Sequence, residues 1–307
     1  MTNPVTRGNI NAALLPVIYE FFGEGYNRYE KQHEQIFTVK KSTRAFEEHV
    51  MNFDTGVGAQ KTEGSMITYD TLGEGFKVRY QHNTYALGII ITKEAIEDDQ
   101  YVDLAKRAST ALGKSLSYTK EVVAANVLNN ALSGSFLGGD GKSLGATDHP
   151  LYGPGGGTYA NKFSAATSLS ETALEAAITN IRGFVDERGM LVNVQPRKLV
   201  VPKELAFTAH RILRSPYRTN TADNDVNVIA DKNLFSEGYI INNYLTSAVN
   251  YFVVTDLDEG LMLFQRSKVA FRVDDTDYRT GNVYISATER YSVGFTNPRG
   301  IYVCPGV

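Results

Sequence analysis

The clearest structural pattern of the chain lies in Asp186–Ser215, which reads DERGMLVNVQPRKLVVPKELAFTAHRILRS. It predicts the end of a helix, a turn closed by Gly189, a short buried strand and a second helix. The apolar run Leu199–Val201 is typical of a buried strand, and Pro202 ends it because proline has no backbone N–H to donate. Small and apolar side chains then recur at helical spacing, at Leu205, Ala206, Ala209, Ile212 and Leu213. On these residues alone, the stretch predicts a strand-to-helix unit of an α/β domain.

Length, charge and cysteine content exclude several classes of protein. The 307 residues are enough for one elaborated domain or two modest ones. The single cysteine, Cys304, excludes an intrachain disulfide and favours folding in a reducing cytoplasm. A net charge of −3 gives the whole chain no general affinity for nucleic acid. No apolar run approaches the ~20 residues that span a bilayer, so we expect a soluble protein with no membrane partner.

Residues 1–45 contain too little apolar surface to fold alone. Asn9–Gly23 holds a short amphipathic run interrupted by Pro16, and Tyr26–Arg44 is mostly charged. We expect this segment to lie along another surface, for which a neighbouring copy of the chain is one candidate. The residues of Tyr26–Arg44 that are expected to be buried are Ile36, Phe37 and Val39.

Tyrosines are numerous and tryptophan is absent. The 18 tyrosines are spread along the chain, and tyrosine suits interfaces because it combines apolar area with one hydrogen-bonding tip. Ordinary core and surface roles explain most of them. Tyr26 and Tyr29, in the charged segment, are candidate contacts between subunits.

Residues 46–91 predict a hairpin that leaves the body of the protein. Gly56–Ser65 is polar and contains no core signal, and strand patterns flank it on both sides. A two-stranded arm is only marginally stable in water, so it is expected to rest on a partner. The strands are expected at Val50–Asp54, Met66–Leu72, Phe76–Tyr80 and Tyr85–Ile91.

Thr92–Leu132 has the longest helical pattern. Thr92 is a suitable cap, a break near Asp99–Gln100 is allowed, Gly113 is a weak point and Gly134 closes the pattern. About thirty residues at ~1.5 Å each give a rod of ~45 Å, well above the usual helix of about 11–12 residues. The sequence therefore predicts one unusually long helix next to the hairpin.

The remaining residues predict a glycine-rich connection and a mixed domain. Ser133–Ser168 is rich in Gly, Ser, Asn and Asp, and Ser170–Gly189 has a helical pattern that ends at its glycine. Further strands are expected at Tyr239–Leu245, Tyr251–Thr255, Leu261–Phe264, Val269–Val273 and Val283–Phe295.

Several of these segments resemble those of tailed-phage major capsid proteins, especially Mu-like major head subunits. Asp186–Ser215 resembles their axial domain, and Asp148–Pro150 with Gly155–Asn161 resembles the connection that precedes it. Glu289–Tyr302 resembles their closing strand, although Asn297-Pro298 replaces the expected aromatic residue before the arginine. A long helix after an extended hairpin is similar to the spine helix of the Hong Kong 97-like capsid fold.

The resemblance implies an α+β fold of the Hong Kong 97-like kind with four parts. Residues 1–45 would be the N-terminal arm and 46–91 the extended loop. Residues 92–169 and 261–307 would form the peripheral domain with the spine helix, and 170–260 the axial domain. The implied function is a major capsid protein that self-assembles into hexamers and pentamers of an icosahedral shell enclosing double-stranded DNA.

The resemblance also implies partners and a location. A scaffolding protein, a portal and decoration proteins are expected partners, and the subunit is expected in the virion after assembly in the host bacterial cytoplasm. No helix-rich charged extension precedes the arm, so we expect a separate scaffolding protein or a mature form.

One loop residue is a candidate for inter-subunit chemistry. Lys61 lies at the expected hairpin tip, where the founding member of the fold forms an isopeptide bond between a lysine and a neighbour's asparagine. The matching asparagine and acid are not recognisable in this sequence. We therefore expect a solvated lysine, with Lys61 as a candidate inter-subunit contact.

The sequence favours no catalytic, cofactor or metal site. Gly139–Ser143 lacks the Walker pattern, because Phe136 stands where a glycine is needed and a helix precedes it in place of a strand. The five histidines and one cysteine lack metal-ligand spacing. His149, directly before a proline, is expected to be solvated or to cap a turn.

Two other functions remain open. An encapsulin-type nanocompartment shell protein shares the fold and encloses enzymes in place of DNA. A cytoplasmic α/β enzyme with an active-site loop at Ser133–Ser168 is the alternative from another class. Particle size separates the enzyme from both shell proteins.

Overall fold

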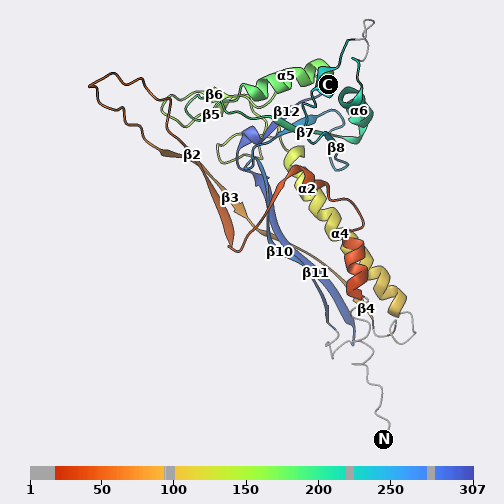
Figure 1. Cartoon of the computed structure of the whole chain (residues 1–307). Coiled ribbons are helices and arrows are strands. Elements are labelled where there is room, and N and C mark those ends of the chain that lie inside the picture. Colours follow the sequence, from red (N-terminus) through yellow and green to blue (C-terminus); the bar gives the residue numbers. More distant parts are fainter. Residues whose placement is uncertain (1–17, 93, 95–100, 219–224, 275–280) are drawn as a thin grey trace.

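The computed structural model describes residues 18–92, 94, 101–218, 225–274 and 281–307. It is a mixed α+β protein in which a long helix lies beside two long strands, with a second sheet at one end (Figure 1). A loop projects sideways from the body near that end (Figure 1). Within the described residues, no helix is both long and apolar enough to cross a bilayer.

The first sheet has the order β1-β10-β11-β4. Its long strands β10 and β11 are antiparallel, β4 pairs with β11, and β1 runs parallel to β10. The two strands predicted at Leu261–Phe264 and Val269–Val273 form one strand whose register shifts between Gln265 and Ala270, which explains the interrupted pattern. The bounds are β1 Thr38–Lys41, β4 Asn83–Ile91, β10 Leu261–Asp274 and β11 Val283–Phe295.

Helix α4, Tyr101–Asn129, packs along this sheet. Its 29 residues correspond to a rod of about 43 Å. Leu112 is fully buried in a cluster that includes Phe271 and Ile285 of the sheet. The helix ends before the predicted Leu132, because asparagine side chains compete for the last carbonyls: Asn130 Nδ2 donates to Asn126 O at 2.8 Å. The predicted break near Asp99–Gln100 lies outside the described residues.

The second sheet has the order β12-β9-β7-β8 and is buried on both faces. Leu199 contributes to the core beneath α5 (Glu171–Arg182) and α6 (Ala206–Arg214), and Val200 to the core shared with α4. Burial on both faces explains why the strand is a continuous apolar run and does not alternate. The bounds are β7 Pro196–Val201, β8 Tyr239–Ile241, β9 Tyr251–Thr255 and β12 Ile301–Cys304. The first of these confirms the strand predicted at Leu199–Val201, whereas β8 is shorter than the predicted Tyr239–Leu245.

Helices α5 and α6 cover the second sheet (Figure 1). Pro202 precedes a 3₁₀ turn, η1 (Lys203–Leu205), and then α6 (Ala206–Arg214), as the sequence predicts. Helix α5 spans Glu171–Arg182 and is capped by Ser170, whose side chain accepts from Ala173 N. The predicted end at Gly189 is wrong, because the backbone N–H of Gly183 already closes the helix onto Thr179 and Asn180.

The remaining elements are short or lie outside the two sheets. Strand β2 (Phe46–Phe53) pairs with β3 (Gly73–Gln81), and the ladder ends at Phe53 opposite Gly73. The strand predicted at Met66–Leu72 is wrong, because that segment has no partner strand and lies in the loop between them. The other bounds are α2 Gln32–Ile36, β5 His149–Pro150, β6 Thr158–Tyr159, α7 Val228–Asp231 and η2 Pro298–Gly300.

Candidate interaction surfaces

Residues 54–72 form a loop that projects from the end of the β2–β3 hairpin (Figure 1). Met66 and Tyr69 are 88% and 84% exposed, so the loop presents apolar area that its own subunit does not cover. Apolar groups gathered on a projecting segment are typical of an interaction site. The other exposed apolar side chains of the loop are Val57, Ile67 and Leu72.

Lys61 lies in this loop and is exposed. Its ammonium group is therefore accessible to a partner, as the sequence analysis predicted for a solvated lysine.

The arm segment, residues 18–44, contacts the body of its own chain. Its first part, residues 18–26, is helical and buries Ile18 and Phe22 against the first sheet. The helix crosses α4 with its backbone in close contact, since a Cβ on Gly25 would lie 2.4 Å from Thr110 O. A Cβ on Gly113 would lie 2.5 Å from Phe22 O. Gly113 was predicted as a weak point of the long helix. Because it has no side chain, it allows the backbone of the arm segment to pack directly against α4.

Tyr26 is fixed by a buried carboxylate. Its hydroxyl lies 3.1 and 3.2 Å from the two carboxylate oxygens of Glu289, which is 1% exposed. Burial and the Glu289 carboxylate raise the pKa of Tyr26, so its hydroxyl stays protonated and donates. Glu289 also accepts from Lys120 Nζ at 2.7 Å and from Gln265 Nε2 at 2.9 Å. The structure therefore gives Tyr26 a partner inside its own subunit, whereas Tyr29 is 59% exposed.

A second buried acid holds α2. Glu121 of α4 accepts from His33 N at 3.0 Å and lies 2.6 Å from His33 Nδ1. Ile36 and Phe37 are buried as predicted, but Val39 is exposed because β1 is an edge strand with one face open to solvent. The arm segment thus lies along another surface, as predicted, but that surface belongs to its own chain.

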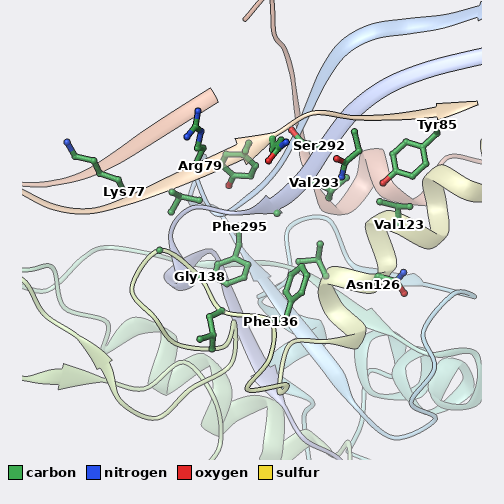
Figure 2. A pocket seen from close by; sticks show the side chains of 18 residues that line it. Lys77, Arg79, Tyr85, Val123, Asn126, Phe136, Gly138, Ser292, Val293 and Phe295 are labelled. Carbon is green, nitrogen blue, oxygen red and sulfur yellow. The ribbon is translucent and has the colours of Figure 1, made fainter. Parts of the chain in front are cut away.

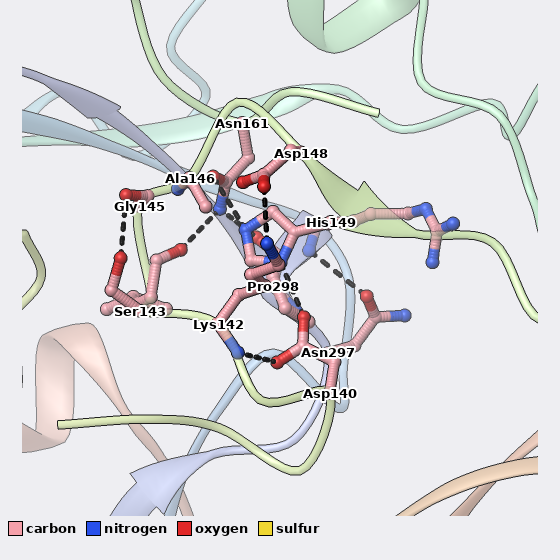
Figure 3. Close-up of polar contacts among 12 residues, drawn as sticks. Asp140, Lys142, Ser143, Gly145, Ala146, Asp148, His149, Asn161, Asn297 and Pro298 are labelled. Atoms are coloured by element: carbon pink, nitrogen blue, oxygen red, sulfur yellow. Dashed lines mark hydrogen bonds and ion pairs between the residues drawn. The ribbon is translucent and has the colours of Figure 1, made fainter. Parts of the chain in front are cut away.

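His149 is fully buried and its ring nitrogens contact two side chains, so the prediction of a solvated or turn-capping histidine is wrong. Its Nδ1 lies 2.5 Å from Asp140 Oδ2, and its Nε2 lies 3.0 Å from Asn161 Oδ1 (Figure 3). Asn161 Nδ2 donates to the backbone oxygens of Leu144 and Pro298 at 2.7 and 2.9 Å. The connection after α4 is therefore a hydrogen-bonded joint that ties the segment before α5 to the segment before β12.

A buried arginine extends this joint. Arg299, 2% exposed, stacks over the ring of Tyr159 at 4.0 Å, and Tyr159 also stacks on His149 with ring centroids 5.1 Å apart. Arg299 Nη1 lies 2.9 Å from Glu187 Oε1, and its Nε donates to Val185 O at 2.7 Å. The joint therefore reaches the turn that follows α5.

A groove of about 520 Å³ lies between β3, β11 and the end of α4 (Figure 2). Val123, Phe136 and Val293 give it apolar walls, and Lys77 and Arg79 line it at the β3 side. Ser292, which also lines it, is bonded to His82 Nδ1 at 3.0 Å, and the other ring nitrogen of His82 lies 3.0 Å from Ser42 Oγ. A histidine held between two serines lacks the carboxylate that would orient it for nucleophilic catalysis. Burial, with help from Arg290 and Arg266, also lowers the pKa of His82.

The residues considered for phosphate or metal binding have structural partners. Lys142 forms an ion pair with Asp148, and Asp140 Oδ1 accepts from Lys142 N at 3.1 Å. Within the residues that the structure describes, no group of three or more His, Cys, Asp or Glu side chains is arranged to hold a metal.

Comparison with known families gives a match over most of the chain. Residues 75–304 match the family described as phage capsid protein. No curated protein sequence matches the chain.

The fold is similar to those of solved shell structures, at low sequence identity. A virus-like particle from Pyrococcus furiosus has a TM-score of 0.57 at 11% identity, covering 94% of this chain and 98% of that one. The capsid of cyanophage P-SCSP1u also has a TM-score of 0.57, at 12% identity, covering 91% and 88%. The capsid of a native GTA particle has a TM-score of 0.53 at 14% identity, covering 88% of each chain.

Proposed function

Because the chain belongs to the phage capsid protein family, we propose that it assembles as hexamers and pentamers into an icosahedral shell around double-stranded DNA. The family match confirms the sequence-based prediction of a tailed-phage major capsid protein. The narrower resemblance to Mu-like head subunits stays a prediction.

The proposed subunit has the parts of the Hong Kong 97-like fold. Residues 1–45 are the arm and 46–91 the extended loop, whose last strand β4 lies in the first sheet. Helix α4 is the spine of a peripheral domain, residues 92–169 and 261–307, to which the packing of α4 on β4 and β11 lends support. Residues 170–260 are the axial domain, and β12 completes its sheet from the end of the described chain.

The observation that carries the proposal is the loop 54–72. Its apolar side chains are exposed on a segment that stands away from the subunit, so their burial requires a neighbour. Lys61 and Tyr29, both exposed, are proposed inter-subunit contacts. Tyr26 contributes indirectly, because it holds the preceding helix on the body through Glu289.

The proposed mechanism is mechanical and involves no catalysis or cofactor. Each contact buries apolar area, and the resulting free energy adds up over the many contacts of a closed lattice. A scaffolding protein, a portal and decoration proteins are the proposed partners. The net charge of −3 favours loose enclosure of DNA over tight binding. The assembled subunit belongs in the virion, and assembly takes place in the host bacterial cytoplasm.

Assembly of the full-length chain tests the proposal. Expression together with the scaffolding protein is expected to give capsomers or shells that sediment as megadalton particles and are visible by negative-stain microscopy. A well-folded product that stays monomeric at high concentration in the presence of the scaffold would overturn it. A small oligomer would favour the cytoplasmic enzyme.

The contents of the particles separate phage capsid from encapsulin. An encapsulin-type shell protein is the alternative, because it shares the fold and encloses protein in place of DNA. Particles formed during infection should contain nuclease-protected double-stranded DNA if the proposal is right. Particles that enclose a protein cargo in place of DNA would favour the nanocompartment.

A further inference from the structure

The turn after α5 is rigid and is anchored in the body. Asp186 Oδ1 accepts from the backbone nitrogens of Arg188 and Met190, each at 2.8 Å, and Asp186 N donates to Met190 O at 2.7 Å. Gly189 supplies the left-handed conformation that this turn needs, with φ +80°. The turn therefore holds the backbone of Arg188 in one place.

Glu187 fixes the turn to the buried joint. It is 3% exposed, and its Oε1 lies 2.9 Å from Arg299 Nη1. Its Oε2 accepts from Tyr152 N at 2.7 Å. At Gly153 the backbones approach so closely that a Cβ would lie 1.9 Å from Glu187 O. Arg188 thus projects from a platform made of three segments distant in sequence.

The guanidinium of Arg188 contacts both sides of the neck of the loop 54–72. The neck consists of an outgoing strand of chain, residues 53–56, and a returning strand of chain, residues 70–73, of which only Phe53 and Gly73 belong to the β2–β3 ladder. Arg188 Nε donates to Asp54 O at 3.0 Å on the outgoing strand. Its Nη1 donates to Asp70 Oδ1 at 3.1 Å, and its Nη2 donates to Thr71 O, both on the returning strand. Only 11% of its side chain is exposed. A planar fork with five donors can bridge two strands in this way, whereas an ammonium group is a point charge.

Two contacts within the neck lie next to Arg188 and join the two sides of the neck. Asp70 Oδ2 accepts from Gly56 N at 2.7 Å, which joins the returning strand to the outgoing one. The ring of Phe53 lies against Gly73, where a Cβ would lie 1.9 Å from Phe53 Cζ. Arg188 Cζ lies 5.3 Å from the centroid of the same ring. Arg188 therefore joins the neck to the body.

We propose that Arg188 is a positioning residue for assembly, which fixes the direction in which the loop 54–72 leaves the subunit before a neighbouring copy binds it. This inference rests on the proposed function, because it assumes that the loop contacts a second copy of the chain. A loop that is already oriented loses less conformational freedom on binding, so the contact with the neighbour is stronger. Arg188 makes no direct contact with the neighbour in this account.

The test compares Arg188→Ala with Arg188→Lys in the full-length chain. A spin label is placed at Lys61→Cys, since the native Cys304 is buried and will not compete. Label mobility is measured by electron paramagnetic resonance at concentrations at which subunits are dissociated, and assembly is measured separately by sedimentation. Arg182→Ala is the matched control, because Arg182 is an exposed arginine at the end of α5 that contacts Gln195 and not the loop.

Arg188→Ala is expected to stay folded, to increase label mobility and to speed amide exchange at Gly56 about tenfold, the scale of one lost charge-assisted hydrogen bond. Arg188→Lys should keep the charge and still show increased mobility, because lysine cannot bridge both strands. Wild-type mobility and exchange in Arg188→Ala would overturn the inference, and so would full rescue by lysine. If the wild type fails to assemble while Arg188→Ala still loosens the loop, the proposed function fails and the positioning contact stands.

Discussion

The arm segment and the loop 54–72 flank the same strand, β2, but only the arm segment packs against its own subunit. The arm segment is charged, yet its helical residues 18–26 and α2 lie on their own subunit through Glu289 and Glu121. The loop contains five exposed large apolar side chains and finds no cover on its own subunit. Apolar content alone therefore does not decide which segment docks. The decisive factor is whether the body offers complementary groups, here two buried carboxylates and Gly113, which lets the helix of residues 18–26 approach α4 closely.

The largest effect is expected where the surface that receives the arm segment is itself destroyed. Leu112→Asp would place a carboxylate at a fully buried site next to the arm helix and the first sheet. The cost of several kcal/mol approaches the ~5–15 kcal/mol of a typical domain, so the chain should not fold. Circular dichroism of the soluble fraction checks this. Leu104→Asp is the control on the same helix, where Leu104 is 39% exposed and the change should be tolerated.

A smaller effect is expected when one docking carboxylate is removed. Glu289→Ala leaves Lys120 buried without its partner and Tyr26 without its acceptor. The free energy of unfolding should fall by about 3–5 kcal/mol, the usual cost of breaking a buried ion pair. Urea denaturation measures it, and limited proteolysis should show faster cleavage near Asn27. Glu259→Ala is the matched control, because its pair with Lys40 is 3.8 Å long and exposed and should contribute under about 1 kcal/mol. Equal losses in both variants would contradict docking through the buried acid.

Removing the tip of the loop should hardly change subunit stability. Residues 57–65 are exposed and Gly56 is half-buried. Their deletion should lower the free energy of unfolding by no more than about 1 kcal/mol, the scale of the hydrogen bond from Gly56 N to Asp70 that is lost. Shell formation should nevertheless be lost, since the loop can no longer reach a neighbour. Sedimentation and circular dichroism of the same sample report both quantities. Replacing the segment with Gly and Ser residues of equal number separates the effect of loop length from that of loop sequence. An unfolded deletion variant would mean that the segment belongs to the core.

The smallest effect is local and depends on pH. The backbone N–H groups of Gly56 and Thr71, with further help from Arg188, lower the pKa of Asp70. A lowered folded-state pKa means that the contribution to stability is present above the unfolded value of about 3.9 and is lost as pH falls through the folded value. Label mobility in the loop should therefore stay low near neutral pH and rise only below about pH 4. Asp70→Asn should be mobile throughout, and equal loosening of both proteins between neutral pH and pH 5 would contradict the assignment.

Local patterns predicted much of the fold from the sequence. The continuous apolar run at Leu199–Val201 predicted a short buried strand, and the long repeat of apolar residues predicted α4. Errors arose where a pattern needed a distant partner to be realised. Met66–Leu72 has strand-forming residues but no strand beside it. Helix α5 ends early because the backbone N–H of Gly183 satisfies its carbonyls before the predicted turn.

The polar joint was harder to predict. His149, Asn161 and Arg299 are separated widely in sequence, and each alone is typical of a solvated loop. They are buried because they form hydrogen bonds with groups far away in the sequence. These partners come together only when the chain is folded. The signal that could have pointed to Arg188 was its position in a tight turn between two acids and a glycine, but the turn gave no indication of which strands the guanidinium would reach.

The order of strands in the two sheets has a consequence for synthesis of the protein. β10 and β11 must pair with β1 and β4, which are made far earlier, and β12 at residues 301–304 completes the second sheet. The first sheet cannot close on the ribosome until β11 has emerged, nor the second until β12 has, so folding is dominated by distant contacts. A nascent chain without these strands therefore has two incomplete sheets. Until then the unpaired strand edges are exposed, and aggregation of nascent chains is the hazard that this topology carries.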